Sequence, residues 1–144
     1  MLQAMNTGHE GSLATVHANT PADAVLRLET LASMTDLSVS FEALRDQINT
    51  AIEVFIQLSR LPTGRRLVTE VAVVTSTHRE AFALTTVAEF VPERDEEGSE
   101  GSGRWIHHGL PAALQTRMRN RGLQIPPAFD REVADELTTR VDEP

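Results

Sequence analysis

The 144-residue sequence contains no cysteine, so disulfide bonds and thiolate metal sites are excluded. It also contains no lysine, and all 13 of its basic residues are arginines. A phosphate-binding loop of the type G-x-x-x-x-G-K-[ST] needs its lysine to reach the terminal phosphates of a nucleotide, so the sequence holds no such loop. No apolar run approaches the roughly 18 residues of a membrane-spanning helix. The first residues also lack the basic and apolar regions of a signal peptide.

Composition predicts a soluble cytoplasmic protein with one domain of ordinary size. Apolar residues make up 40% of the sequence, which permits a core, although aromatic residues contribute only 4%. The formal net charge is −8 and the isoelectric point is near 5.0. This balance argues against nucleic acid or an anionic membrane surface as the main partner.

The most informative stretch is residues 7–20, TGHEGSLATVHANT. It indicates a glycine-flanked loop, a short buried strand over residues 12–16, and a polar edge that begins the next helix. Ligands bind at the carboxyl ends of strands in open α/β sheets, which makes His17 a candidate site residue. A histidine at a strand end is also commonly structural, and the two glycines can serve only as a helix cap and a turn.

Helix signals recur along the chain. Thr20-Pro21-Ala22-Asp23 combines an N-cap hydroxyl, a proline at the first helical position and an acid in the first turn. The helix that follows is predicted to bury one stripe, with Arg27 and Glu29 off it; the stripe comprises Val25, Leu28, Leu31 and Ala32. Ser40 is predicted to cap a second helix over residues 41–50, with Arg45 and Asp46 pointing away from its apolar face. Leu110-Pro111 begins a further helix, which ends at Gly122.

The period of the apolar residues then changes from 3.6 to 2, which predicts a strand over residues 52–59. The expected strands cover residues 52–59, 67–74, 82–91 and 105–108, and the first two form an antiparallel hairpin. Residues 93–103 are acidic and rich in glycine and serine, which is typical of a flexible loop. Residues 124–130 are expected to be extended. His107 and His108 are adjacent, and neighbours on a strand point to opposite faces, so we do not expect a metal site there.

The tip of the predicted hairpin carries Arg60, Arg65 and Arg66. Three arginines at one turn can clamp a phosphate or an acidic neighbour. They can equally be a charged turn that keeps the hairpin soluble, and Arg27 can be an ordinary solvated helix residue.

Residues 7–31 resemble the His box of bacterial secretion and pilus-assembly ATPases. The pattern is T-G-H-[acid]-G-S-x-A-T-x-H-A-N-[ST]-P, followed by an A-x-x-R-L-E helix, as in TGHEGSLATVHANTPADAVLRLETL. This variant is similar to that of the tight-adherence (Tad, CpaF-type) pilus ATPases in the type II/IV secretion superfamily. The similarity continues through Gln57-Leu58-Ser59-Arg60 and Gly64-Arg65-Arg66 to about Val91, and more loosely to Phe129.

The resemblance implies an α/β fold: a partial RecA-like (P-loop NTPase) motor domain that lacks the P-loop strand and carries a C-terminal β-hairpin and helical add-on. The implied organisation is a C-terminal part of the motor domain over residues 1–91, an acidic loop over 92–104, an add-on over 105–130 and a tail over 131–144. Because both Walker motifs are missing, the chain is expected to be a fragment that begins inside a helix and is inactive alone.

The implied function is ATP hydrolysis with Mg²⁺, which powers tight-adherence pilus assembly or type II/IV secretion. The family works as a cytoplasmic hexameric ring at the bacterial inner membrane, on platform proteins of the pilus or secretion system and not on nucleic acid. The resemblance implies that His17 is a catalytic phosphate sensor and that His9 and Arg60 contact the nucleotide. It implies that Arg27, Arg65 and Arg66 lie at the subunit interface. A non-catalytic module that docks into a secretion ATPase ring stays open, as does an unrelated soluble α/β binding domain.

Overall fold

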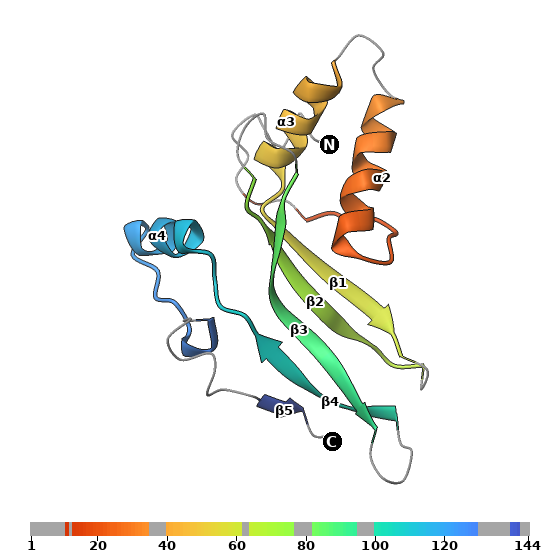
Figure 1. The fold of residues 1–144 in the computed structure, drawn as a ribbon, viewed down its shortest axis with the longest axis vertical. Coiled ribbons are helices and arrows are strands. Elements are labelled where there is room, and N and C mark those ends of the chain that lie inside the picture. The colour runs from red at the N-terminus through yellow and green to blue at the C-terminus, as the bar shows by residue number, and fades with distance from the viewer. Residues whose placement is uncertain are drawn as a thin grey trace. The chain divides into compact units, whose positions relative to one another are not determined.

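The structure is a computed structural model, and it describes residue 11 and residues 13–34, 40–61, 64–76, 82–94, 100–129 and 139–141 (Figure 1). The helix expected over residues 1–6, His9 and most of the tail expected over 131–144 lie outside the described residues. The described chain falls into two compact units. The first comprises residues 1–55 with 73–84, and the second comprises residues 56–72 with 85–144.

Two helices begin where their capping signals predict. Helix α2 (Pro21–Ser33) starts after Thr20, whose Oγ1 accepts a hydrogen bond of 3.0 Å from the backbone N–H of Asp23. Helix α3 (Phe41–Ala51) starts after Ser40, whose Oγ accepts from the N–H of Ala43 at 3.2 Å. Each cap satisfies one of the amide groups that a helix start leaves without an intrahelical partner. The sequence prediction of both helix starts is confirmed.

The core of the first unit lies between these helices, which run side by side (Figure 1). Helix α2 contributes Ala24 and Val25, and helix α3 contributes Leu44 and Ile48, whose exposed fraction is 0%. Beyond the helices, the rings of Phe55 and Phe82 meet edge to face, with centroids 6.3 Å apart. Burial of such side chains contributes about 1.5–3 kcal/mol each.

The predicted polar faces of α2 and α3 need correction. Leu31, expected in the core, is 49% exposed, whereas Glu29 is only 8% exposed. The carboxylate of Glu29 accepts a hydrogen bond of 3.0 Å from Nε of Arg45 on α3. A carboxylate can be buried when it is paired and hydrogen-bonded, so the two helices are joined by an ion pair that apolar periodicity does not reveal.

Five strands form one sheet in the order β1-β2-β3-β4-β5. Their bounds are Val54–Arg60 for β1, Arg66–Val74 for β2, Leu84–Arg94 for β3, Glu100–His107 for β4 and Thr139–Val141 for β5. Strands β3 and β4 pair antiparallel, as do β4 and β5. The sheet is therefore a meander of consecutive strands, and its first four strands overlap the four that were expected, although β4 begins at residue 100 and not at 105.

Two sequence expectations about the acidic region and the tail are corrected by these bounds. Strand β3 continues through Pro92, which pairs with Gly103, and the register shifts between Pro92 and Arg94. Residues 92–94 and 100–104 of the expected loop instead belong to strands β3 and β4, and residues 95–99 lie outside the described residues. A β-bulge accommodates a proline that cannot donate to the ladder. The expected tail contains strand β5.

The buried strand expected over residues 12–16 is wrong within the described residues. Residues 13–18 carry no strand, and Leu13 is 100% exposed. A short apolar run forms a strand only where another strand pairs with it, and none of the described strands pairs with residues 13–16. The described parts therefore show an α/β chain with an antiparallel sheet, while the RecA-like arrangement stays a prediction.

The second unit packs its core around β3 and β4. Val87, Ala88 and Phe90 are buried on β3, and Leu110 is buried after β4. A Cβ at the buried Gly103 would lie 2.3 Å from Cζ of Phe90, so only glycine leaves room for that ring. The ring of Phe90 also packs against Trp105, with centroids 5.9 Å apart.

Helix α4 (Ala112–Asn120) follows β4 and ends before Gly122, whose φ is +73°. The left-handed conformation at Gly122 matches the predicted helix stop. Residues 127–129, expected to be extended, form instead a 3₁₀ turn (Pro127–Phe129). The N–H of Leu110 donates to the carbonyl of Phe129 at 3.0 Å, and this bond anchors the turn beside the end of β4.

Candidate functional site

His17 lies in the extended segment that precedes helix α2, and it is exposed. The end of this segment is held by Thr20, whose carbonyl accepts from the N–H of Ala24 at 3.0 Å, and by the buried Pro21. The start of α2 carries partial positive charge, which favours anions nearby, although Asp23 in the first turn opposes it. An exposed imidazole three residues before a capped helix can donate a hydrogen bond to an anion such as a phosphate.

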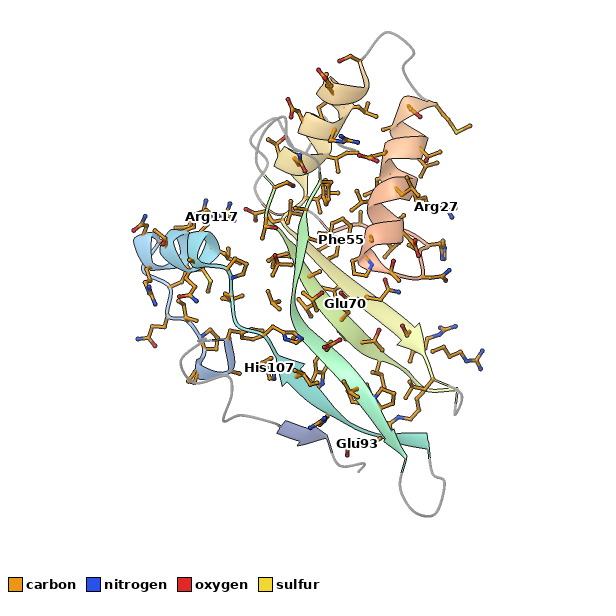
Figure 2. The ribbon with its side chains drawn as sticks, viewed as in Figure 1. Arg27, Phe55, Glu70, Glu93, His107 and Arg117 are labelled. Atoms are coloured by element: carbon orange, nitrogen blue, oxygen red, sulfur yellow. The ribbon has the colours of Figure 1, made fainter. Side chains whose placement is uncertain are left out.

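Arg27 lies on helix α2 on the side away from α3, and it is exposed (Figure 2). The helix cap at Thr20 fixes where this guanidinium emerges. A delocalised, always charged guanidinium suits a carboxylate or phosphate on another molecule. The interface role that the resemblance implies for Arg27 stays a prediction.

The structure gathers the three predicted hairpin arginines at the turn between β1 and β2. Nε of Arg60 donates to the carbonyl of Gly64 at 3.3 Å. The turn itself is closed by the N–H of Leu61, which donates to the carbonyl of Arg65 at 2.8 Å, and by the positive φ of +88° at Gly64. Arg60, Arg65 and Arg66 are all exposed. The two strand ends at this turn therefore present three guanidinium groups, and the carbonyl of Gly64 orients that of Arg60.

The predicted site residues fall into two groups in the described chain. His17 and Arg27 belong to the first unit, and the hairpin arginines belong to the second. His9 lies outside the described residues. The described residues thus provide one anion-binding candidate in each unit.

Sequence reasoning missed two features of the interior. The first is the Glu29–Arg45 pair between α2 and α3. The available signal in the sequence was that Glu29 lies four residues after the buried Val25, on the same face of α2. The second is His107 on β4 (Figure 2), whose ring lies between Trp105 and Phe129, with centroids 6.5 and 5.2 Å away. Its Nδ1 is buried and has no hydrogen-bond partner among the described residues. Trp105 and His107 are two residues apart on a strand and so lie on one face, and this spacing was the available signal for their ring contact.

Polar side chains also pair along the strands of the second unit. The hydroxyls of Ser59 and Thr69 lie 2.8 Å apart between β1 and β2. The hydroxyl of Thr86 on β3 donates to Glu70 on β2 at 2.8 Å. These pairs satisfy partly buried polar atoms within the sheet, so we assign them to its stability.

Two further classes of site find no support in the part of the chain that the structure describes. No group of three histidine, aspartate or glutamate side chains is placed to hold a metal ion. None of the helices described is long and apolar enough to cross a membrane.

Comparison with known proteins relates the His17 segment to secretion systems. Residues 1–63 match the family model described as "Type II/IV secretion system protein". These residues include the His17 segment, α2, α3 and β1. The match supports the type II/IV secretion superfamily. The similarity to type II/IV secretion proteins that residues 7–31 suggest is thus supported at the level of the superfamily.

Curated conjugal transfer proteins match part of the chain. A conjugal transfer protein of Mycobacterium tuberculosis is 38% identical over 85 residues, which are 59% of this chain and 24% of that protein. The conjugal transfer protein TrbB of Sinorhizobium fredii is 36% identical over 67 residues, or 46% of this chain and 19% of its own length. TrbB of Rhizobium radiobacter is 34% identical over 67 residues, or 46% and 20%. The chain therefore spans about a quarter or less of these relatives.

Proposed function

We propose that this chain is one segment of a secretion motor ATPase of the tight-adherence pilus type, in which ATP hydrolysis drives pilus assembly or type II/IV secretion. The observation that carries the proposal is the sequence TGHEGSLATVHANT, residues 7–20, which ends at the N-cap of helix α2. It lies in the region that matches the secretion family, and it ends in the capped start of a helix. The tight-adherence subtype rests on the resemblance of this run alone.

The proposal divides the chemistry between this chain and a P-loop that lies elsewhere. Phosphoryl transfer needs a phosphate cradle, Mg²⁺ and an oriented water, and its catalysis is mostly positioning and charge stabilisation. With no lysine in the sequence, the cradle cannot be here. The described residues also lack a group of acids placed to hold Mg²⁺. We therefore assign sensing to this chain and the binding of ATP and Mg²⁺ mainly to the missing part.

His17 is the proposed sensor because it is exposed and is followed by a structurally fixed helix start. A hydrogen bond from its imidazole to a charged phosphate oxygen contributes about 1.5–3 kcal/mol, which corresponds to roughly a 10- to 150-fold effect. Such a difference can bias a movement between two subunit positions. Arg60, oriented by the carbonyl of Gly64, is the second phosphate contact that we propose, and His9 is a further one.

The proposed assembly is a homo-oligomer, a hexamer in the full-length form, at the cytoplasmic face of the inner membrane. We assign Arg27, Arg65 and Arg66 to contacts between neighbouring subunits because all three are exposed guanidinium groups. Platform proteins of the pilus or secretion system are the proposed partners, and the acidic net charge of −8 agrees with a motor that does not act on nucleic acid.

The test begins with the product made in the native cells. Mass spectrometry should find peptides upstream of Met1 that include a G-x-x-x-x-G-K-[ST] loop. In that longer product, His17→Ala should lower the ATPase rate 10- to 150-fold while ATP binding changes little, because the cradle is intact. His108→Ala, which removes an exposed histidine of the second unit, is the matched control and should leave the rate unchanged. Equal rates for wild type and His17→Ala would contradict the proposal.

A second function is favoured by one observation, the absence of lysine. If the native product has a mass of 15.8 kDa, it cannot bring its own P-loop, and the proposal becomes a non-catalytic module that docks into a secretion ATPase ring. Co-purification with a P-loop ATPase, lost on Arg65→Glu with Arg66→Glu, distinguishes the module from an inactive remnant.

A further inference from the structure

Helix α2 carries a carboxylate at a position where an apolar residue is expected. Pro21, Val25 and Glu29 follow one another at spacings of four, so they lie on one face of the helix, and all three are buried. Among the described residues, Glu29 is the only buried charged residue, with an exposed fraction of 8%. Its Oε1 accepts a hydrogen bond of 3.0 Å from Nε of Arg45 on helix α3. The contact between the two helices therefore includes one directed ionic bond.

A buried ion pair is a poor choice if stability is its only purpose. Well-packed apolar residues of similar volume are commonly as stabilising, because the charges lose their hydration on burial. Apolar contacts also tolerate a small shift of one helix against another, whereas a charge-assisted hydrogen bond requires a defined distance and direction. Setting a register is the best-supported use of such pairs. The bond between Glu29 and Arg45 is thus satisfied in one register, that is, in one alignment of α2 along and around α3.

Helix α3 is itself fixed to the rest of the first unit. The hydroxyl of Ser76, which follows β2, donates to Oδ1 of Asn49 at 2.8 Å. Asn49 lies four residues after Arg45, so the ionic bond and the bond to Ser76 are one helical turn apart. Leu44 and Ile48, next to them in the sequence, are buried. Helix α3 therefore provides a fixed reference for the position of α2.

The register of α2 decides where the His17 segment lies. Oγ1 of Thr20 accepts from the N–H of Asp23, and its carbonyl accepts from the N–H of Ala24, so Thr20 moves with the helix. His17 stands only three residues before Thr20. A turn or a slide of α2 on α3 therefore displaces the imidazole as well. A misplacement of about 1 Å can cost on the order of 100-fold in the rate of a reaction.

We propose that Glu29 and Arg45 are positioning residues for the phosphate sensor, because their bond holds α2 in the register from which His17 reaches the phosphate. This role rests on the proposed function and adds two residues that act through helix α2 and not by contact with the phosphate. A pair that only stabilised the first unit could be replaced by apolar residues without any effect on the sensor. The two roles are therefore separable by experiment.

The register is measured without nucleotide, on the 144-residue chain. Because the sequence contains no cysteine, Ala22→Cys on α2 and Ala43→Cys on α3 supply the only two thiols, and both positions are exposed. Spin labels on these thiols report the distance between the helices by pulsed electron paramagnetic resonance. We expect one narrow distance distribution with the native pair, and the same distribution with Glu29→Gln, whose side-chain oxygen can still accept from Arg45.

The apolar pair, Glu29→Leu with Arg45→Met, should broaden or shift this distribution while circular dichroism shows that the helices remain. Arg45→Met alone is the second variant, because it changes a side chain that is 33% exposed and so disturbs the core less. It should have the same effect on the distance. The same narrow distribution in both variants overturns the proposal.

The catalytic consequence is measured in the longer product that carries the P-loop. The apolar pair should lower kcat about tenfold and change KM for ATP less than about twofold, because the phosphate cradle is untouched. In the His17→Ala background the same pair should cost less than about twofold, since it acts through His17. Glu42→Gln, which removes an exposed acid of α3, is the matched control and should change neither the distance nor the rate.

A purely stabilising pair gives a different result. The variants would then unfold at a lower temperature, yet keep the native distance distribution and the native kcat, and this outcome overturns the proposal. Equal losses of rate with and without His17 overturn it too, because the pair would then act elsewhere. An unchanged rate for His17→Ala alone contradicts the proposed function instead, and the distance distributions still decide whether the pair sets the register.

Discussion

Replacement of Gly103 by alanine should destabilise the second unit, because a close approach between β3 and β4 depends on the missing Cβ. A Cβ at this position would lie 2.3 Å from Cζ of Phe90 and 2.7 Å from the carbonyl oxygen of Val91. The ring of Phe90 is buried and packs against Trp105, and the carbonyl is backbone, so neither moves without a cost. Overpacking of this kind costs about 1–3 kcal/mol. We expect about 2–3 kcal/mol here, because a backbone atom cannot rotate away.

The assay for Gly103→Ala is thermal unfolding followed by circular dichroism and by the fluorescence of Trp105, the single tryptophan. For a chain of this size, a loss of about 2–3 kcal/mol lowers Tm by roughly 5–12 °C. The double variant with Phe90→Leu supplies the control, because leucine removes the ring-edge atoms that the new methyl group meets. Gly103→Ala should cost at least about 1 kcal/mol less in that background. An unchanged Tm, or the same cost in both backgrounds, would refute the β3–β4 register that pairs Pro92 with Gly103.

Three further stability predictions follow from single contacts, and each is measured by urea unfolding. Glu29→Ala should cost about 1–2 kcal/mol, because it removes the charged hydrogen bond to Arg45, and Glu29→Gln should cost less; no loss would contradict the buried pair. Thr20→Ala should cost about 1 kcal/mol through the lost cap to the N–H of Asp23, whereas Thr20→Ser should restore most of it, and equal stabilities would argue against the cap. His107→Phe should be neutral or stabilising by up to about 1 kcal/mol, since Nδ1 is buried without a partner among the described residues; a clear loss would show that this atom is bonded.

Local signals in the sequence predicted the elements that depend on neighbouring residues. The hydroxyl and proline at Thr20-Pro21 predict the start of α2, Ser40 predicts the start of α3, and Gly122 predicts the end of α4. The change of period near residue 52 predicts β1. Each signal works because capping and alternation are decided within a few residues.

Features that depend on distant partners were not predictable. The run around Leu13 has the composition of a buried strand, yet within the described residues no strand pairs with it. Glu29 looked like a surface residue because its partner, Arg45, lies 16 positions away on another helix. The continuation of β3 through Pro92 required the bulge and the partner Gly103. Periodicity shows which face of a segment is apolar, but it does not show which partners the rest of the chain provides for that segment.

The candidate site was predictable in part for the same reason. The hairpin turn brings Arg60 and Arg65 together, as the turn residues around Gly64 indicate. His17 stands in the segment before α2, where it was expected, although without the strand that was to place it.

We propose that this chain carries a phosphate sensor without a phosphate cradle. The most direct measurement is phosphate release from ATP and Mg²⁺ by the purified 144-residue chain and by its His17→Ala variant. Both are expected to release phosphate no faster than buffer, because no lysine is present to hold the terminal phosphates. Turnover by the chain that His17→Ala abolishes would contradict it.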